Sequence, residues 1–214
     1  MKDLLIIQFA KWPEFGKVKT RLAISVGNEH AFNTHITLME TVFNNISGVE
    51  GSDFELWLNK DGLHQKAVTN NSFSIKAKSA VLNIVNKNGI IVNIQQGKTL
   101  GDKMAQAFIL SLVNYRKVII VGSDCPNVCV DTLKKASEAL KHSDMVIQPA
   151  EDGGYVLIGA RRFQGNLFDK VEWGQGKVLQ QTLMNIEQNQ YSYSLLDLSW
   201  DVDDVEDYHR WINS

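Results

Sequence analysis

The run KVIIV at residues 117–121, followed at once by GSDCP at residues 122–126, is the stretch that decides the fold. The run is short and rich in β-branched residues, which is typical of a strand buried on both faces. Gly122 ends the strand, and Asp124 follows two residues later. In open α/β sheets, ligands bind beyond the carboxyl ends of the strands. The sequence therefore predicts a buried strand with an acid at the mouth of a ligand crevice.

Strands and helices alternate on either side of this run. Short apolar runs predict further strands at residues 4–9, 54–58, 90–94, 145–148, 155–158 and 193–198. Apolar residues at helical spacing predict helices at residues 29–46, 100–112, 131–140, 177–186 and about 205–212. Residues 10–20 are a loop, and residues 59–89 show no clear pattern. The alternation favours an α/β fold with a mostly parallel sheet covered on both faces. No change in composition divides residues 1–214, which we expect to form a single domain.

The composition argues against several classes of protein. The chain has 214 residues, of which 44% are hydrophobic and 21% charged, as in ordinary globular proteins. Its formal net charge of −2 argues against a protein that coats nucleic acid or an anionic membrane, because both tasks need a basic surplus. The two cysteines do not form a disulfide framework, and no apolar run has the length of a signal peptide or a membrane span. We expect a cytoplasmic protein.

The loop after the first predicted strand is strongly basic. It holds one acid, Glu14, against four cations within eleven residues: Lys11, Lys17, Lys19 and Arg21. The backbone amide of Gly16 can approach an oxyanion closely. Backbone amides together with Lys and Arg are the groups that bind phosphate. The P-loop spacing is absent. The pattern favours a phosphate site, and a solvated basic loop is the alternative.

Two other segments place acids at strand ends. Asp124 follows the buried strand directly, and a carboxylate there can hold Mg²⁺ with phosphate and water as the other ligands. Asp131 is the better cap for the helix that follows, so we favour the metal role for Asp124. Asp152 begins an Asp-Gly-Gly sequence, which is typical of a tight hairpin turn without chemistry. Alternatively, Asp152 could accept a hydrogen bond from a substrate hydroxyl or assist the metal. Both interpretations of Asp152 stay open.

The acid cluster at residues 201–207 also has two interpretations. Asp203 or Asp204 is a natural cap for the last helix, whose positive end the next acids suit. Capping leaves Asp201 unexplained, and a second metal carboxylate here would complement Asp124. The cysteines and the five histidines show no zinc spacing. Cys125 is interpreted as a packed residue and not as a nucleophile.

Five motifs in this order resemble a known family: FAKWPEFGKVKTRL, LGDKM, GSDCP, PAEDGGYVLIG and DVDDVEDY. The chain resembles the uncharacterised bacterial glycosyltransferase-A-like (GT-A-like) transferases, which are related to the 2-phospholactate and molybdenum-cofactor guanylyltransferases. The resemblance extends from Leu4 to about Tyr208, and the first, third and fourth motifs are the specific ones. It implies a three-layer, Rossmann-like nucleotide-diphospho-sugar transferase fold. This chain departs from the pattern at Asp204 and Val205, where relatives have Thr-Pro.

The resemblance also implies roles for individual residues. Base and phosphates would be held by the first loop and the LGDKM motif, through Phe9, Ala10, Lys11, Gly16, Gly101 and Met104. The basic catalytic residues would be Lys17, Lys19 and Arg21. A divalent cation, Mg²⁺ or Mn²⁺, would be held by Asp124 and Asp203. The second substrate would face Asp152, which is also a catalytic candidate, and Gly153, Gly154 and Tyr155.

Three functions follow as hypotheses. The first is nucleotidyl transfer from a nucleoside triphosphate to a small-molecule acceptor with release of pyrophosphate, which the basic first loop slightly favours. The second is sugar transfer from a nucleotide sugar, with Asp152 as the base. The third is a nucleotide-binding module without catalysis. The sequence leaves a homodimer open and predicts neither a nucleic-acid nor a membrane partner.

Overall fold

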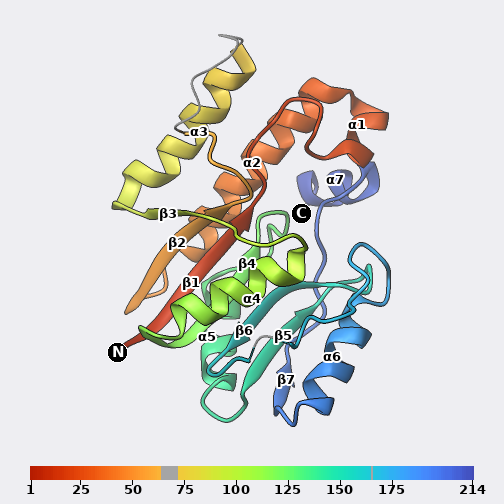
Figure 1. Cartoon of the computed structure of the whole chain (residues 1–214). Helices are drawn as coiled ribbons and strands as arrows, with labels where there is room; N and C mark the ends of the chain where they lie inside the picture. Colours follow the sequence, from red (N-terminus) through yellow and green to blue (C-terminus); the bar gives the residue numbers. More distant parts are fainter. Residues whose placement is uncertain (64–71, 165) are drawn as a thin grey trace.

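The computed structural model describes residues 1–63, 72–164 and 166–214. Within these residues, seven strands form one sheet in the order β3-β2-β1-β4-β6-β5-β7 (Figure 1). The strands are β1 (Lys2–Ala10), β2 (Ser52–Leu58), β3 (Ile91–Ile94), β4 (Tyr115–Gly122), β5 (Met145–Pro149), β6 (Tyr155–Ala160) and β7 (Tyr193–Leu195). The helices are α1 (Thr20–Val26), α2 (Asn28–Ile46), α3 (Ser72–Asn88), α4 (Leu100–Ser111), α5 (Val130–Ala139), α6 (Val178–Gln188) and α7 (Val205–Ile212).

The sheet is mostly parallel, with one reversed strand. Strands β1, β2, β3 and β4 are parallel neighbours, and β5 is parallel to β7. Strand β6 runs antiparallel to both β4 and β5. Its first residues therefore lie at the edge where β1 and β4 end, together with the turn between β5 and β6. This reversal brings the Asp152 turn to the carboxyl edge of the parallel strands.

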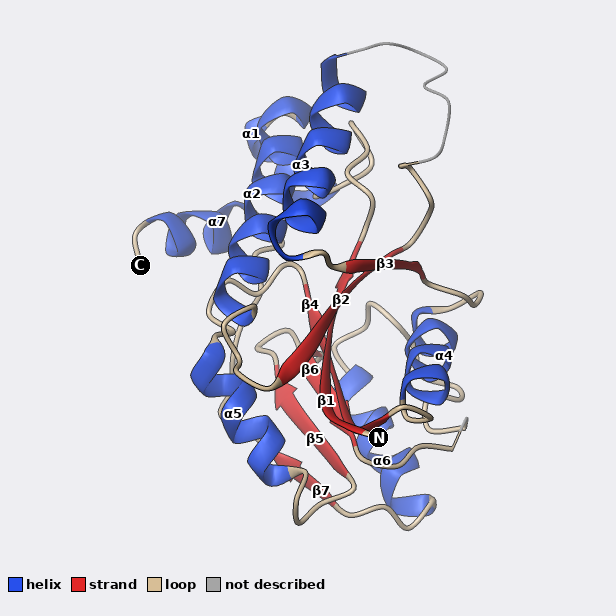
Figure 2. Cartoon of the chain, turned by 90° about the vertical axis from the view of Figure 1, so that its left-hand side faces the viewer, coloured by secondary structure: helices blue, strands red, loops and turns tan. Residues whose placement is uncertain are grey.

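Helices cover both faces of the sheet and form three layers. In β1, Leu4 and Ile6 pack into a core with α2 and α5, whereas Leu5 and Ile7 pack into a core with α4 and α6. A third core joins α2 and α3 to β2. Figure 2 shows α5 and α2 on one side of the strands and α4 and α6 on the other. Because both faces are covered, the central strands are continuously apolar, and the predicted three-layer α/β fold is confirmed.

Four local predictions need correction. Helix α1 was not predicted, and neither was α3, which lies in the stretch without a clear pattern. Helix α3 is rich in Asn, Ser and Lys, whose weak helix signal hides the apolar face made by Ala77, Val81 and Ile84. Strand β7 ends at Leu195 and not at residue 198. Helix α5 begins one residue earlier than predicted, after Cys129, so Asp131 lies in its first turn and is not its cap. Residues 64–71 of the unclear stretch lie outside the described residues.

None of the helices in the described part of the chain combines the length and the apolar composition that a membrane span requires.

A buried carboxylate connects the strands β5, β6 and β7 at one edge of the sheet. Asp144, directly before β5, is 6% exposed. It accepts hydrogen bonds from Arg162, from Arg161, and from the backbone and hydroxyl of Ser192 before β7. The Arg162 guanidinium, followed by the Ser192 donors, holds the pKa of Asp144 well below its ordinary value. The charged form of Asp144 therefore fixes the strand order at this edge.

We predict that Asp144→Ala lowers the free energy of unfolding by about 2 kcal/mol at pH 7, because it removes a buried carboxylate that accepts charge-assisted hydrogen bonds from Arg161 and Arg162 and further bonds from Ser192. A depressed folded-state pKa stabilises the protein above the unfolded pKa of about 3.9, and this contribution is lost as the pH falls further. Urea unfolding at pH 7 and pH 3 measures both effects. Because the folded-state pKa is held so low, the wild type loses only part of this contribution by pH 3 and the rest at lower pH, whereas the variant has none of it to lose.

The control for Asp144→Ala is Asp131→Ala. Asp131 forms an ion pair with Lys135, four residues along α5, and its side chain is 71% exposed. A surface pair of this kind contributes less than about 0.5 kcal/mol. Equal losses in the two variants would contradict the structural role of Asp144.

Candidate active site

A pocket of about 340 Å³ opens at the carboxyl edge of the parallel strands. It is bounded by the ends of β1 and β4, the start of β6, the first turn of α4 and the segment that precedes α7. Its size suits a small-molecule ligand. Its polar and charged lining residues, other than Tyr155, are Lys11, His35, Asn59, Gln95, Lys103, Ser123, Asp124 and Asp201.

A buried polar network fixes the floor of this pocket. The side-chain amide of Gln8 on β1 donates to the backbone oxygen of Met39 on α2 and to the hydroxyl of Ser123 after β4. Ser123 in turn donates to the backbone oxygen of Phe9, over 2.9 Å. Gln8 is 2% exposed, so these bonds replace water inside the protein. The ends of β1 and β4, which carry the first loop and Asp124, are thereby held in register.

Lys19 is the buried cation of the site. It has a left-handed backbone (φ 49°, ψ 46°), which is uncommon for a non-glycine residue and persists only where the surroundings impose it. Its Nζ lies 2.8 Å from Oδ2 of Asp124 and also donates to the backbone oxygen of Val202. Burial alone would raise the pKa of Asp124, but the nearby cations, Lys19 first, lower it. Asp124 therefore carries a negative charge.

The segment before α7 is fixed beside Asp124. The backbone amide of Val202 donates to the backbone oxygen of Asp124 over 2.8 Å. This bond brings Asp201 into the pocket lining. Burial first, and then the negative charges of Asp152 and Asp124, raise the pKa of Asp201 to about 6. The sequence shows that helix capping does not explain Asp201, but it does not identify Asp201 as a site residue.

Asp203 has a different environment. Its carboxylate lies 2.7 Å from the guanidinium of Arg21, and both side chains are substantially exposed. Neither residue lines the pocket. Asp204 is the cap of α7, which confirms one of the two predicted caps. The roles of Asp203 at a metal and of Arg21 on phosphates stay predictions.

The other residues of the first loop divide into two groups. Phe9, Ala10 and Lys11 line the pocket as the resemblance implies. Lys17 instead lies 2.7 Å from Glu14 and is 71% exposed. Gly16, the residue before Lys17, lies exposed in a turn and has a φ of 74°. Lys17 and Gly16 stand outside the pocket lining, and their contact with a nucleotide stays a prediction.

The LGDKM motif enters the site through different residues from those predicted. A Cβ on Gly101 would lie 2.7 Å from Phe168 and 2.9 Å from Trp173, so this glycine permits close packing on the far side of α4. Met104 is 4% exposed in the core. Leu100 and Lys103 are the residues of this helix that line the pocket. A helix presents only one face to a ligand, and a motif of five residues does not reveal which face that is.

The turn between β5 and β6 has a clear structural role. Asp152 accepts a hydrogen bond from the amide of Gly154 over 2.8 Å, and Gly153 has φ 84°. A Cβ on Gly153 would lie 2.2 Å from the backbone oxygen of Gly176. The hairpin interpretation is therefore confirmed. Tyr155 lines the pocket, and the substrate contacts of this turn stay predictions.

Sequence reasoning missed His35 on α2, which is 3% exposed and lines the pocket. Its Nε2 lies 3.0 Å from the backbone oxygen of Lys11, and its Nδ1 lies 3.9 Å from Oδ1 of Asp124. Burial is the main cause that lowers the pKa of His35. A single histidine in an amphipathic helix gives no sequence signal, because only the fold brings it to the strand edge.

The buried thiol of Cys125 is structural. It donates to the backbone oxygen of Gly122 over 2.8 Å, and burial raises its pKa well above the ordinary value. A protonated buried thiol is a poor nucleophile. The interpretation of Cys125 as a packed residue is confirmed.

The acids of the pocket fit a divalent cation. Oδ1 of Asp124 is buried and has no hydrogen-bond partner among the described residues. The pKa of Asp201 is raised partly because other carboxylates face it, and a cation would relieve that excess of negative charge. Within residues 1–63, 72–164 and 166–214, no three His, Cys, Asp or Glu side chains form a ready-made metal site. A bound Mg²⁺ or Mn²⁺ would therefore take further ligands from phosphate and water.

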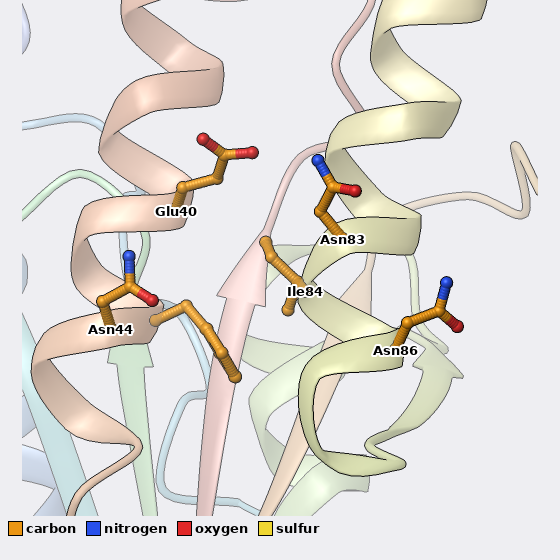
Figure 3. Close-up of a pocket in the computed structure, with 6 residues that line it drawn as sticks. Glu40, Asn44, Asn83, Ile84 and Asn86 are labelled. Carbon is orange, nitrogen blue, oxygen red and sulfur yellow. The ribbon is translucent and has the colours of Figure 1, made fainter.

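A second cavity of about 470 Å³ lies between α2 and α3, away from the strand ends (Figure 3). Glu40 and Asn44 of α2 and Asn83, Ile84 and Asn86 of α3 are among the residues that line it. The described residues that line this cavity include one carboxylate, Glu40, and three side-chain amides.

Comparisons with known proteins agree with this fold. A solved structure from Desulfovibrio desulfuricans G20, of a protein assigned to the nucleotide-diphospho-sugar transferases, is 29% identical, with a TM-score of 0.82 over 99% of this chain and 87% of that one. A nucleotidyl transferase from Methanothermobacter thermautotroptrophicus is 12% identical, with a TM-score of 0.64 over 100% and 97%. Rv0371c from Mycobacterium tuberculosis H37Rv, solved in complex with manganese, is 14% identical, with a TM-score of 0.52 over 100% of both chains.

No protein of curated function matches the chain. The predicted nucleotide-diphospho-sugar transferase fold and the resemblance to GT-A-like transferases are confirmed by the solved structures. Residues 50–175, which are more than half of the chain, match the family described as uncharacterized protein conserved in bacteria, DUF2064, and the chain therefore belongs to that family.

Proposed function

We propose that this protein is a transferase that binds a nucleotide with a divalent cation in the pocket at the strand edge and transfers its nucleotidyl group to a small-molecule acceptor. One observation carries the proposal: a single pocket joins two exposed or half-exposed cations, Lys11 and Lys103, with two acids, Asp124 and Asp201. Cations bind phosphates, and carboxylates hold the metal that accompanies them. The 29% identical relative, a protein assigned to the nucleotide-diphospho-sugar transferases, supports the transferase class.

The cation would be held by Asp124 and by an acid of the segment before α7. Asp203 is the acid that the family resemblance implies, and Asp201 is the one that lines the pocket. When bound, the metal supplies positive charge to the phosphate oxygens. Lys19 is a positioning residue, because its Nζ holds both the Asp124 carboxylate and the backbone of Val202.

Transfer then depends on position and charge. Lys11 and Lys103 bind the phosphates, and an oxygen of the acceptor attacks the α-phosphorus of a nucleoside triphosphate. A new phosphorus–oxygen bond forms, the bond between the α-phosphorus and the bridging oxygen breaks, and pyrophosphate leaves with that oxygen. A phosphate acceptor is already anionic at neutral pH and needs no general base.

Sugar transfer is the second candidate, because the 29% identical relative is assigned to the nucleotide-diphospho-sugar transferases. The acceptor oxygen would attack the anomeric carbon, the bond from that carbon to the phosphate would break, and a nucleoside diphosphate would leave. A base must then take the proton of the acceptor hydroxyl. Asp152 is the candidate, since its charge acts on Asp201 in the pocket.

We predict that one nucleoside triphosphate stabilises the protein in a Mg²⁺-dependent manner. A ligand at a hundred times its Kd adds about 2.7 kcal/mol of stability, which a thermal-shift panel of triphosphates and nucleotide sugars detects. Asp124→Asn should abolish this shift, and Asp131→Asn on the exposed face of α5 should keep it. Circular dichroism establishes that each variant is folded. A Mg²⁺-dependent shift that survives in folded Asp124→Asn would refute the metal role.

The released product separates the two transfers. With the stabilising nucleotide and a mixture of phosphorylated and hydroxyl acceptors, we expect pyrophosphate to appear in a coupled phosphate assay after inorganic pyrophosphatase is added. Release of a nucleoside diphosphate from a nucleotide sugar would establish sugar transfer instead. Binding without either product across the acceptor mixture would favour a nucleotide-binding module.

The lining of the pocket also predicts which lysines contribute most to nucleotide affinity. We predict that Lys11→Ala and Lys103→Ala each raise the Kd of the nucleotide by about tenfold, because each removes one charge-assisted phosphate contact of about 1.5 kcal/mol. Lys17→Ala should change the Kd less than twofold, since Lys17 pairs with Glu14 outside the pocket lining. Isothermal titration measures all three. A larger loss of affinity in Lys17→Ala than in the other two variants would favour the phosphate-binding role that the family resemblance implies for Lys17.

A further inference from the structure

Two hydrogen-bond acceptors face each other at the base of the pocket. The backbone oxygen of Lys11 can only accept, so Nε2 of His35, 3.0 Å away, carries the ring proton of the neutral imidazole. Nδ1 is then a bare lone pair, and it lies 3.9 Å from Oδ1 of Asp124. That oxygen is buried and has no hydrogen-bond partner among the described residues. Two buried acceptors so close together need a donor or a cation between them.

We propose that Nδ1 of His35 is a nitrogen ligand of the divalent cation that Asp124 holds. This inference rests on the proposed function and names a ligand of the same site. Metal–nitrogen and metal–oxygen bonds in proteins are about 2.0 to 2.2 Å long, so two ligand atoms of one cation lie at most about 4.3 Å apart. The 3.9 Å between Nδ1 and Oδ1 falls within that limit.

The surroundings of His35 fit a metal ligand. A metal-bound histidine commonly donates its other ring proton to a backbone carbonyl, which fixes the ring and the tautomer. Here the backbone carbonyl of Lys11 accepts the hydrogen bond from Nε2 of His35, and Lys11 itself lines the pocket. Asp201 also lines the pocket, and its negative charge attracts a cation. Lys19 pairs with the other carboxylate oxygen of Asp124, Oδ2. The lone pair and Oδ1 therefore remain directed to a third group.

A nitrogen ligand changes which metal the site prefers. Mg²⁺ prefers oxygen ligands, whereas imidazole suits transition metals, and Mn²⁺ accepts both donor types. We therefore expect Mn²⁺ to bind at least about tenfold more tightly than Mg²⁺ in the wild type. His35→Gln keeps an amide near Nε2 to donate to Lys11 but removes the lone pair at Nδ1, so the preference should disappear.

The test uses Mn²⁺ with inorganic pyrophosphate and the full-length chain. Pyrophosphate contains no nitrogen, so any nitrogen that couples to Mn²⁺ in pulsed electron paramagnetic resonance belongs to the protein. We expect a directly bound nitrogen in the wild type, and a change of that coupling when histidine alone carries ¹⁵N. In His35→Gln the coupling should vanish and the Kd of Mn²⁺ should rise about tenfold or more.

The matched control is His142→Gln, an exposed histidine beyond α5, which should keep the coupling. If His35→Gln fails to fold, a wild-type spectrum without nitrogen coupling still overturns the inference. Mn²⁺ bound without nitrogen coupling would overturn the inference and leave the proposed function intact, with a water molecule between Nδ1 and Oδ1. No binding of Mn²⁺ would overturn the inference together with the metal dependence of the proposed function.

Discussion

The ion pair between Lys19 and Asp124 is the interaction on which the candidate site depends. Lys19 is the N-cap of α1, Asp124 follows β4, and the Lys19 amine also binds the backbone of Val202 before α7. One buried amine thus joins three segments that are distant in the sequence. The amine is almost fully buried, so it needs its anionic partner, and the left-handed backbone of Lys19 is held against its local preference. These contacts place Asp201, Asp124 and the first loop around one pocket.

Parallel strands explain why so many chemical groups meet there. Strands β1 and β4 end at the same edge, and the reversal of β6 returns the Asp152 turn to it. At this edge, burial first and then the negative charges of Asp152 and Asp124 raise the pKa of Asp201. Within the described residues, the buried amine of Lys19 pairs with one of these carboxylates, Asp124. The remaining negative charge explains why a cation fits, and the lysines around the mouth explain why the cation would arrive with phosphate.

The sequence predicted most of the fold and part of the site. The continuous apolar run of β4 and the helical spacing of α2 and α4 are local signals, and the structure has these elements close to the predicted positions. Asp124 and Lys11 were found because residues after buried strands lie at the ligand edge. The sequence does not reveal three other pocket residues. His35 and Lys103 line the pocket because of the way α2 and α4 are rotated against the sheet, and Asp201 does so because its neighbour Val202 bonds to the distant Asp124. Asp201 and Asp203 are two residues apart in the sequence, and their different surroundings follow from tertiary contacts: the backbone bond of Val202 to Asp124 and the ion pair of Asp203 with Arg21.

The contact between Lys19 and Val202 spans 183 residues. Contacts of such long sequence separation form late, because the entropy of closing the intervening chain must first be offset by other packing. During synthesis the sheet edge through β1, β2 and β4 can assemble before residue 202 has emerged, with Lys19 and Asp124 already paired. Asp201 then arrives last. The proposed nucleotide site is therefore completed only when the segment around residue 202 is in place, and a ribosome-bound intermediate would expose the strand edge without Asp201.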